Sequence, residues 1–215
     1  MNTKQSSSAS ELARETEREM VRRLRDNRTA VFAIRLSSYA QQKVDAVVDE
    51  TAKSGVQFAC AKGCGYCCSL EVSSFPQETF RIARELSART DREAVVAKLT
   101  EHVAQNPSGI DRLQRKPCPF LVDRACSIYD VRPLACRKCV SLDVEQCRQM
   151  SETVPSNEAM YYKTEAITLG MMAAYARIKR PSAPHEFVSS LLFAMNDPTA
   201  EQRWWNGEDV FASPG

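Results

Sequence analysis

Apolar residues recur at intervals of three and four positions along most of the chain, which predicts a mainly α-helical fold. The clearest case is a helix over residues 157–180, whose stripe at helical spacing consists of Met160, Thr164, Ile167, Met171, Tyr175 and Ile178. The same pattern predicts further helices over residues 8–28, 29–54, from Pro76 onward, 90–105 and 185–195. The tail that carries Trp204 and Trp205 is expected to pack back onto the body.

Capping and turn residues set the expected ends of these elements. Ser8 with Glu11 and Thr90 with Glu93 have capping-box spacing, and Ser74 is expected to cap the helix at Pro76. One stretch, residues 117–129, has strand character and predicts a short hairpin. The other expected markers are Gly55 at a helix end, a hairpin turn at Asp123 and Arg124, and helical turns capped by Asp130 and Asp143.

The length of 215 residues, with 43% hydrophobic and 26% charged residues, predicts one globular body. We expect it to be a small helical metal-binding protein with a short β-hairpin near its cysteines. The expected parts are a disordered tail over 1–9, N-terminal helices over 10–56 that pack on the body, a cysteine-cluster domain over 57–150, and C-terminal helices over 151–215 that complete the same core.

Charge and hydropathy narrow the expected partners. A net charge of +2 without a block of like charges argues against a nucleic-acid partner. No apolar run approaches the roughly 18 residues of a membrane helix, and the polar N-terminus predicts no secretory leader. We therefore expect a cytoplasmic protein, in which thiols are kept reduced.

All nine cysteines lie between residues 60 and 147, which is the most informative feature of the sequence. Clustered cysteines in a reducing compartment point to metal binding or redox chemistry before structural disulfides. With only two histidines, His102 and His185, both distant from the clusters in sequence, the pattern favours an all-thiolate site for zinc, iron or an iron–sulfur cluster. The candidate ligands form two clusters, Cys60, Cys64, Cys67, Cys68 and Cys118, Cys126, Cys136, Cys147, with Cys139 left over.

Several neighbouring residues have expected roles at this site. Gly63 and Gly65 allow the tight backbone that lets closely spaced thiolates converge. Because the adjacent Cys67 and Cys68 rarely bind one ion together, each metal is expected to draw ligands from both clusters. Arg132 and Arg137 either neutralise the thiolates or pair with a nearby Asp, with Arg137 favoured for neutralisation, and Phe120 is expected to cover the site from solvent.

The run Cys60…Cys64-Gly65-Tyr66-Cys67-Cys68, followed by Cys118-Pro119-Phe120-Leu121, Cys126-Ser127-Ile128-Tyr129 and Arg132-Pro133-Leu134-Ala135-Cys136-Arg137, resembles the bacterial YkgJ-type cysteine-cluster family, also called CxxCxxCC or zinc- or iron-chelating domain proteins. The resemblance covers about residues 58–148. It implies a mostly helical metal-chelating fold, with family cysteines at Cys60, Cys64, Cys67, Cys68, Cys118, Cys126, Cys136 and Cys147. Cys139 is an addition to that pattern.

Three functions stay open at this point. The favoured one is a metal-binding protein without catalysis of its own. The second is an iron–sulfur redox or methyl-transfer enzyme, because the cysteine pattern also resembles the N-terminal part of flagellin lysine methylases; the Cys60-x3-Cys64-x2-Cys67 spacing of radical-SAM enzymes is present, but the predicted helices do not fit their βα barrel. The third is a metal-stapled interaction module.

Overall fold

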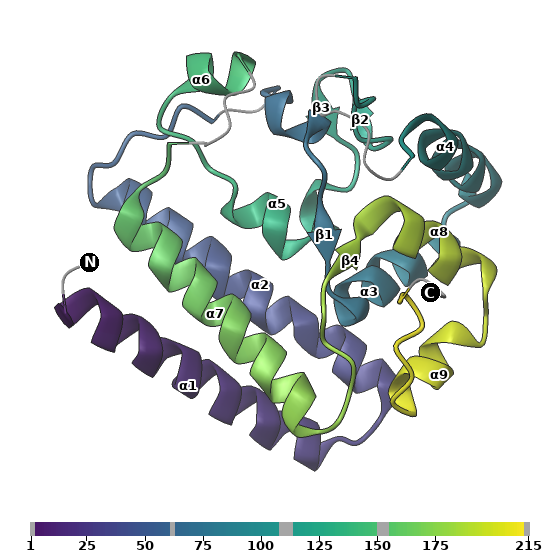
Figure 1. Ribbon diagram of the computed structural model, residues 1–215, viewed down its shortest axis with the longest axis horizontal. Coiled ribbons are helices and arrows are strands. Elements are labelled where there is room, and N and C mark those ends of the chain that lie inside the picture. The colour runs from purple at the N-terminus through teal and green to yellow at the C-terminus, as the bar shows by residue number, and fades with distance from the viewer. Residues whose placement is uncertain (1–2, 61–62, 108–113, 150–154, 213–215) are drawn as a thin grey trace.

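The computed structural model describes residues 3–60, 63–107, 114–149 and 155–212, and these residues are mainly α-helical, as the sequence predicts (Figure 1). The helices are α1 Thr3–Asp26, α2 Ala30–Lys53, α3 Pro76–Ser87, α4 Arg92–Gln105, α5 Leu134–Lys138, α6 Val144–Arg148, α7 Glu158–Arg177, α8 Phe187–Asn196 and α9 Ala200–Trp205. Two short 3₁₀-helices span Tyr66–Ser69 and Tyr129–Val131. The strands form two antiparallel pairs, β1 Ser73–Ser74 with β4 His185–Glu186, and β2 Leu121–Val122 with β3 Ala125–Cys126.

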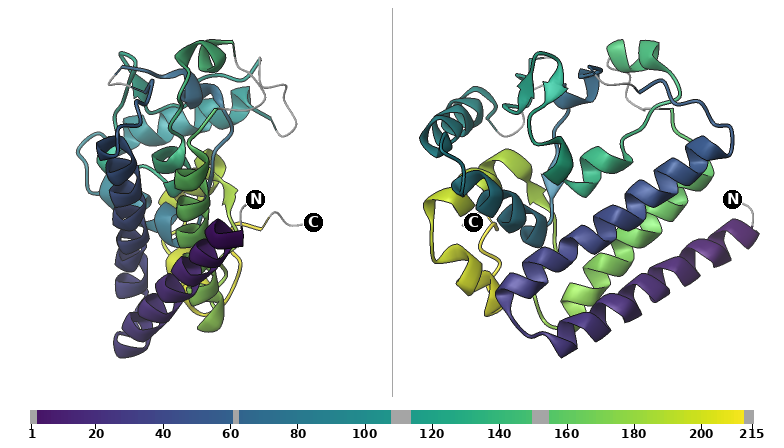
Figure 2. Two further views of the ribbon diagram at one scale, coloured as in Figure 1. Left: turned by 90° about the vertical axis from the view of Figure 1, so that its left-hand side faces the viewer. Right: turned by 180° about the vertical axis from the view of Figure 1, so that it is seen from behind.

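The three long helices α1, α2 and α7 form one layer of the molecule, in which α7 packs against both α1 and α2 (Figures 1 and 2). The expected stripe of α7 is buried from Met160 to Tyr175, and it meets Met20 and Leu24 of α1 and Ile34 of α2. The Tyr175 hydroxyl donates to the backbone carbonyl of Ala33 at 2.5 Å, so the one polar atom of this buried ring is satisfied. The long α7 prediction is confirmed, although the helix ends at Arg177.

A second core lies between α3, α4 and α8 and contains Ile82, Leu99, Phe187 and Leu191. The ring of Trp204 on α9 belongs to the first core, lies 5.6 Å from the ring of Phe80, and donates its indole N–H to a backbone carbonyl, that of Pro181. The expectation that the C-terminal residues pack back onto the body is therefore confirmed for this tryptophan.

Several expected element ends are confirmed. Gly55 follows α2 with φ +98°, the left-handed conformation that ends a helix. The hairpin turns at Asp123 and Arg124, with φ of 49° and 63°, as a two-residue turn between right-twisted strands requires. The Asp143 carboxylate accepts from the amides of Glu145 and Gln146 and caps α6.

Other expected ends are wrong. Helix α1 begins at Thr3 and continues through residues for which the sequence predicted a disordered tail, so the Ser8 capping box does not mark its start. Phe75, not Ser74, is the N-cap of α3, because the Glu78 side chain reaches back to its amide. The N-cap of α4, Asp91, makes no side-chain capping bond.

At α5 the expected cap also differs. Asp130 lies inside a 3₁₀-helix, and Pro133 precedes α5. As a separate finding, no helix of the described residues is long and apolar enough to cross a membrane.

Candidate metal centre

The nine cysteines occupy the end of the molecule formed by the chain between α2 and β1, the β2–β3 hairpin, α5 and α6 (Figure 1). All are free thiols and all are partly exposed. Their positions follow the chain: Cys60 and Cys64 after α2, Cys67 and Cys68 in the first 3₁₀-helix, Cys118 before the hairpin, Cys126 on β3, Cys136 in α5, Cys139 at its C-cap and Cys147 in α6. Short elements thus bring thiols from both sequence clusters to one end of the fold.

Backbone hydrogen bonds join the two sequence clusters directly. The amide of Cys118 donates to the carbonyl of Cys68 at 2.7 Å, and the amide of Ala59 donates to the carbonyl of Ser141 at 2.8 Å. The amide of Ser141 in turn donates to the sulfur of Cys60 at 3.2 Å. An amide bond to sulfur favours the thiolate form, which is also the form that binds metals.

Cys67 lies at the centre of the thiols. Its sulfur accepts hydrogen bonds from the thiols of Cys139 and Cys68, and these two bonds hold the pKa of Cys67 well below its usual range. The same hydrogen bonds raise the pKa values of Cys139 and Cys68, because each thiol must keep its proton in order to donate it to Cys67. Cys139, the residue left over in the sequence, is therefore part of the cluster.

The remaining thiols form two groups around Cys67, which differ in the neighbouring thiolates whose charges raise the pKa of each member. Burial raises the pKa of Cys60, and the charges of Cys64, Cys67 and Cys147 raise it further. Cys139 feels Cys67 and Cys60 more strongly than Cys136. We call these four residues the Cys60 group: Cys60, Cys64, Cys139 and Cys147.

The second set surrounds Cys118. Burial raises the pKa of Cys118 to about 11 and that of Cys136 to about 12, and for both thiols the charges of Cys126 and Cys67 add to the effect. Cys68 feels Cys118 and Cys126 after Cys67. We call these four residues the Cys118 group: Cys68, Cys118, Cys126 and Cys136. Each group contains thiols from both sequence clusters.

The donor set fits a thiophilic metal, since it consists of sulfur alone and is reachable from solvent. Among the described residues, however, no three His, Cys, Asp or Glu side chains are arranged to hold an ion. Instead, the thiols of Cys139 and Cys68 donate hydrogen bonds to the sulfur of Cys67. Metal binding would therefore require side chains within each group to rotate and draw together.

The two candidate arginines have different surroundings. The charge of Arg132 lowers the pKa values of Cys67, Cys126 and Cys136, although it is not the largest influence on any of them. Arg137 is buried, pairs with Asp45 of α2 at 2.5 Å, and donates to the backbone carbonyls of Asp130 and Arg132. The guanidinium of Arg137 is thus occupied by a partner, Asp45, that the sequence did not indicate, whereas the charge of Arg132 reaches the thiols.

Phe120 and the two histidines are not on the solvent side of the thiols. Phe120 is buried in the second core, against which Cys118 and Cys126 pack, so it shields their inner side rather than the solvent side. His102 is buried on α4, and burial lowers its pKa, while His185 pairs with Asp209 at 2.9 Å. Neither histidine joins the thiols.

Sequence reasoning missed the place of Cys139, although a signal for it exists. Cys136 and Cys139 form a Cys-x-x-Cys pair, a spacing that is common among metal ligands and that indicates a place for both at the centre. Helix α5 ends at Lys138, and the two thiols belong to different groups.

The fold and these thiols define a helical protein with a cysteine-rich, metal-binding segment. Residues 59–160 match the family model described as "CxxCxxCC: Putative zinc- or iron-chelating domain". The matched part of the chain holds all nine cysteines, and the match confirms the resemblance to this family that is seen in the sequence. No curated protein and no solved structure shows significant similarity to the chain.

Proposed function

We propose that this protein holds zinc or iron, the iron as single ions or as an iron–sulfur cluster, through its clustered cysteine thiolates. One observation supports the proposal above the others. Thiols that are up to 87 positions apart, from Cys60 to Cys147, gather at one end of the fold around Cys67. Packing alone does not call for nine partly exposed cysteines in one place, since buried cysteine is the ordinary structural case.

The proposed ligands are the eight cysteines of the family pattern, with Cys139 as a ninth. The Cys60 group and the Cys118 group each supply four thiols, the number that a tetrahedral zinc site or an iron–sulfur cluster takes. Cys67 accepts hydrogen bonds from one member of each group, Cys139 and Cys68, and lies between them, where it can replace one thiol of either group so that each site keeps four sulfur ligands. The proposal therefore predicts two metal sites.

Four thiolates on a divalent ion carry two negative charges in excess. The guanidinium of Arg132 is the cation whose charge reaches members of the cluster, so we assign it the role of offsetting that excess. Because the ligands must be reduced thiolates, we place the protein in the cytoplasm.

Two double variants test this assignment on protein purified without oxygen. Cys64→Ser with Cys147→Ser removes two thiols of the Cys60 group, and Cys118→Ser with Cys126→Ser removes two thiols of the Cys118 group. Elemental analysis should find that each double variant binds about half the metal of the parent protein and that the combined variant binds none. A parent protein that takes up neither zinc nor iron would overturn the proposal.

A further inference from the structure

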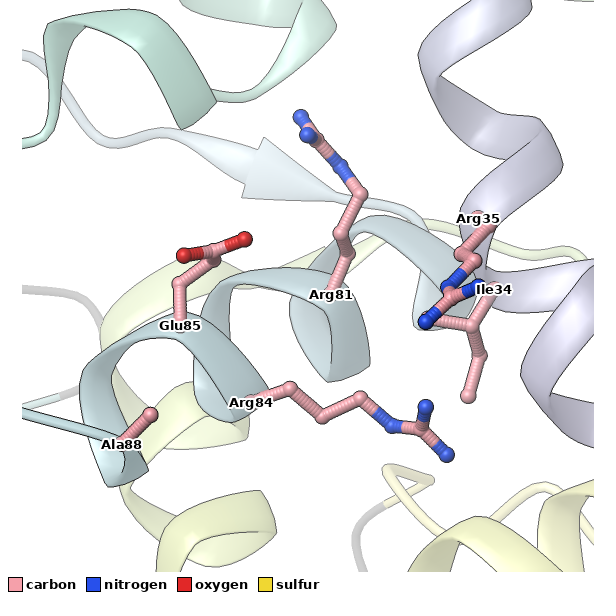
Figure 3. Close-up of a pocket in the computed structure, with 6 residues that line it drawn as sticks. All are labelled: Ile34, Arg35, Arg81, Arg84, Glu85 and Ala88. Atoms are coloured by element: carbon pink, nitrogen blue, oxygen red, sulfur yellow. The ribbon is translucent and has the colours of Figure 1, made fainter.

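A cavity of about 410 Å³ lies between α2 and α3, and no cysteine lines it (Figure 3). It is lined by Ile34, Arg35, Arg81, Arg84, Glu85 and Ala88. None of these residues is a candidate metal ligand. The volume falls within the range of about 300–1,000 Å³ that small-molecule sites occupy.

Three arginines and one carboxylate, Glu85, line this cavity, and the Arg81 guanidinium points away from those of Arg35 and Arg84 (Figure 3). Within the described part of the chain, the guanidinium of Arg35 makes no hydrogen bond and no ion pair. Arg84 pairs with Glu201 of α9, and its Nε lies 2.8 Å from Oε2 of that residue. This pairing uses one edge of the guanidinium and leaves donors on the other side.

The third arginine is held without a direct ion pair. A terminal nitrogen of Arg81 donates to the side-chain carbonyl of Gln41, and its Nε is buried with no hydrogen-bond partner among the described residues. Burial lowers the pKa of Arg81, and the charge of Arg137 lowers it further. The charges of Glu78 and Glu85 act in the opposite direction, so Arg81 already has carboxylates near it and is not the residue that offers a place for an anion.

The side chains are directed in a way that separates the charges. Figure 3 shows the Arg84 side chain extending toward α2, to the side where Arg35 and Ile34 lie. The Glu85 carboxylate lies on the other side of the view, away from both guanidinium groups. An anion between Arg35 and Arg84 would thus meet two guanidinium groups from two helices, apart from Glu85 and on the edge of Arg84 that Glu201 does not occupy.

We infer that this cavity binds the oxyanion group of a small molecule, a phosphate or a carboxylate, between Arg35 and Arg84. A guanidinium presents paired N–H donors that match the oxygens of either group. Ala88 supplies apolar surface for the rest of the ligand, while Ile34 is buried beneath the cavity and the Arg81 guanidinium points away from it toward Gln41. The site is separate from the metal centre and does not depend on the proposed function.

Titration calorimetry on the full-length protein, with inorganic phosphate and with malonate at constant ionic strength, tests the inference. The variants are Arg35→Gln and Arg84→Gln, and the matched control is Arg25→Gln, which removes the same charge from an exposed position on α1. Arg81 is left intact because its bond to Gln41 connects it to the fold.

We expect saturable binding of at least one anion, weakened about fivefold or more by Arg35→Gln and by Arg84→Gln and unchanged by Arg25→Gln. The anion that binds more tightly identifies the ligand class. No saturable binding of either anion would overturn the inference, as would equal affinity in all three variants. Circular dichroism of each variant confirms that a loss of binding is not a loss of fold.

Discussion

The buried carboxylate of Glu78 accepts a hydrogen bond from the backbone amide of Leu134 at 2.9 Å, across 56 residues of sequence. The same oxygen accepts from the side-chain amide of Gln41 on α2 at 2.7 Å, and the other oxygen accepts from the amide of Phe75 at 3.4 Å. Leu134 begins α5, the helix that carries Cys136. A single fully buried side chain therefore joins α2, α3 and α5 beneath the thiols.

Replacing Glu78 by Ala should lower the free energy of unfolding by about 3 kcal/mol, because three buried donors lose their acceptor. Urea unfolding measures this loss. Glu85→Gln is the matched control, since Glu85 is exposed on the same helix and should shift stability by less than about 0.5 kcal/mol. Equal stabilities of the two variants would show that Glu78 does not join these helices.

Glu78 also predicts a pH dependence. Burial raises the pKa of Glu78 above its ordinary value of 4.5, so above that value the native state holds this proton more tightly than the unfolded state. Stability from this group is therefore lost as the pH rises from 4.5 through the raised pKa. Glu78→Gln cannot titrate and should show a shallower decline over this window, whereas an identical pH profile would contradict the assignment.

The contact between α1 and α7 depends on Gly170. A β-carbon at this position would lie 2.4 Å from the carbonyl oxygen of Ala13 and 2.8 Å from the β-carbon of Thr16. Gly170→Ala should therefore destabilise the protein by about 1–3 kcal/mol, despite the better helix propensity of Ala. Leu169→Ala, at an exposed neighbouring position, should change thermal unfolding little. Unaltered stability of Gly170→Ala would mean that α1 does not pack this closely.

Arg132 and Arg137 should respond differently to the same substitution. Arg132→Gln removes a charge near the thiolates and should weaken metal binding about threefold to tenfold, while Arg132→Lys should retain most of the affinity. Arg137→Gln breaks the pair with Asp45 and should instead lower the thermal stability of the metal-free protein. Competition with a chromophoric chelator and thermal unfolding separate the two effects; a weaker metal affinity in Arg137→Gln alone would reverse our assignment.

Cys139 should behave as a ligand although it is an addition to the family pattern. Cys139→Ser should lower the affinity of the Cys60 group by at least about tenfold, because that group then has three thiols of its own and must compete with the Cys118 group for Cys67. Ser69→Ala provides a control, since it changes a side chain close to Cys67 and Cys68 without removing a thiol. Unchanged metal binding in Cys139→Ser would place this thiol outside the site.

The sequence predicts the parts of the structure that short-range chemistry determines. The stripe from Met160 to Tyr175, the left-handed Gly55 and the turn at Asp123 and Arg124 each follow from spacing or backbone preference. The predicted helix ends at Ser74 and Asp130 are wrong for two local reasons: the Glu78 side chain caps α3 at Phe75, and Pro133 immediately precedes α5.

The site was predictable in composition but not in arrangement. The nine clustered cysteines predict a thiolate site. Their grouping around Cys67, however, depends on how the hairpin and α5 fold against the first 3₁₀-helix. The partner of Arg137 could not be foreseen either, because Asp45 lies 92 positions away on α2. Long-range pairings of this kind leave no periodic trace in one sequence.

X-ray absorption spectroscopy at the metal edge, on protein purified without oxygen, tests the central claim most directly. It reports the atoms bound to the metal rather than its presence alone. The thiolate assignment predicts a first shell of sulfur, at about 2.3 Å if the metal is zinc, with acid-labile sulfide present only if the iron is in a cluster. A first shell of nitrogen and oxygen would contradict the account, because it would place the metal away from the cysteines.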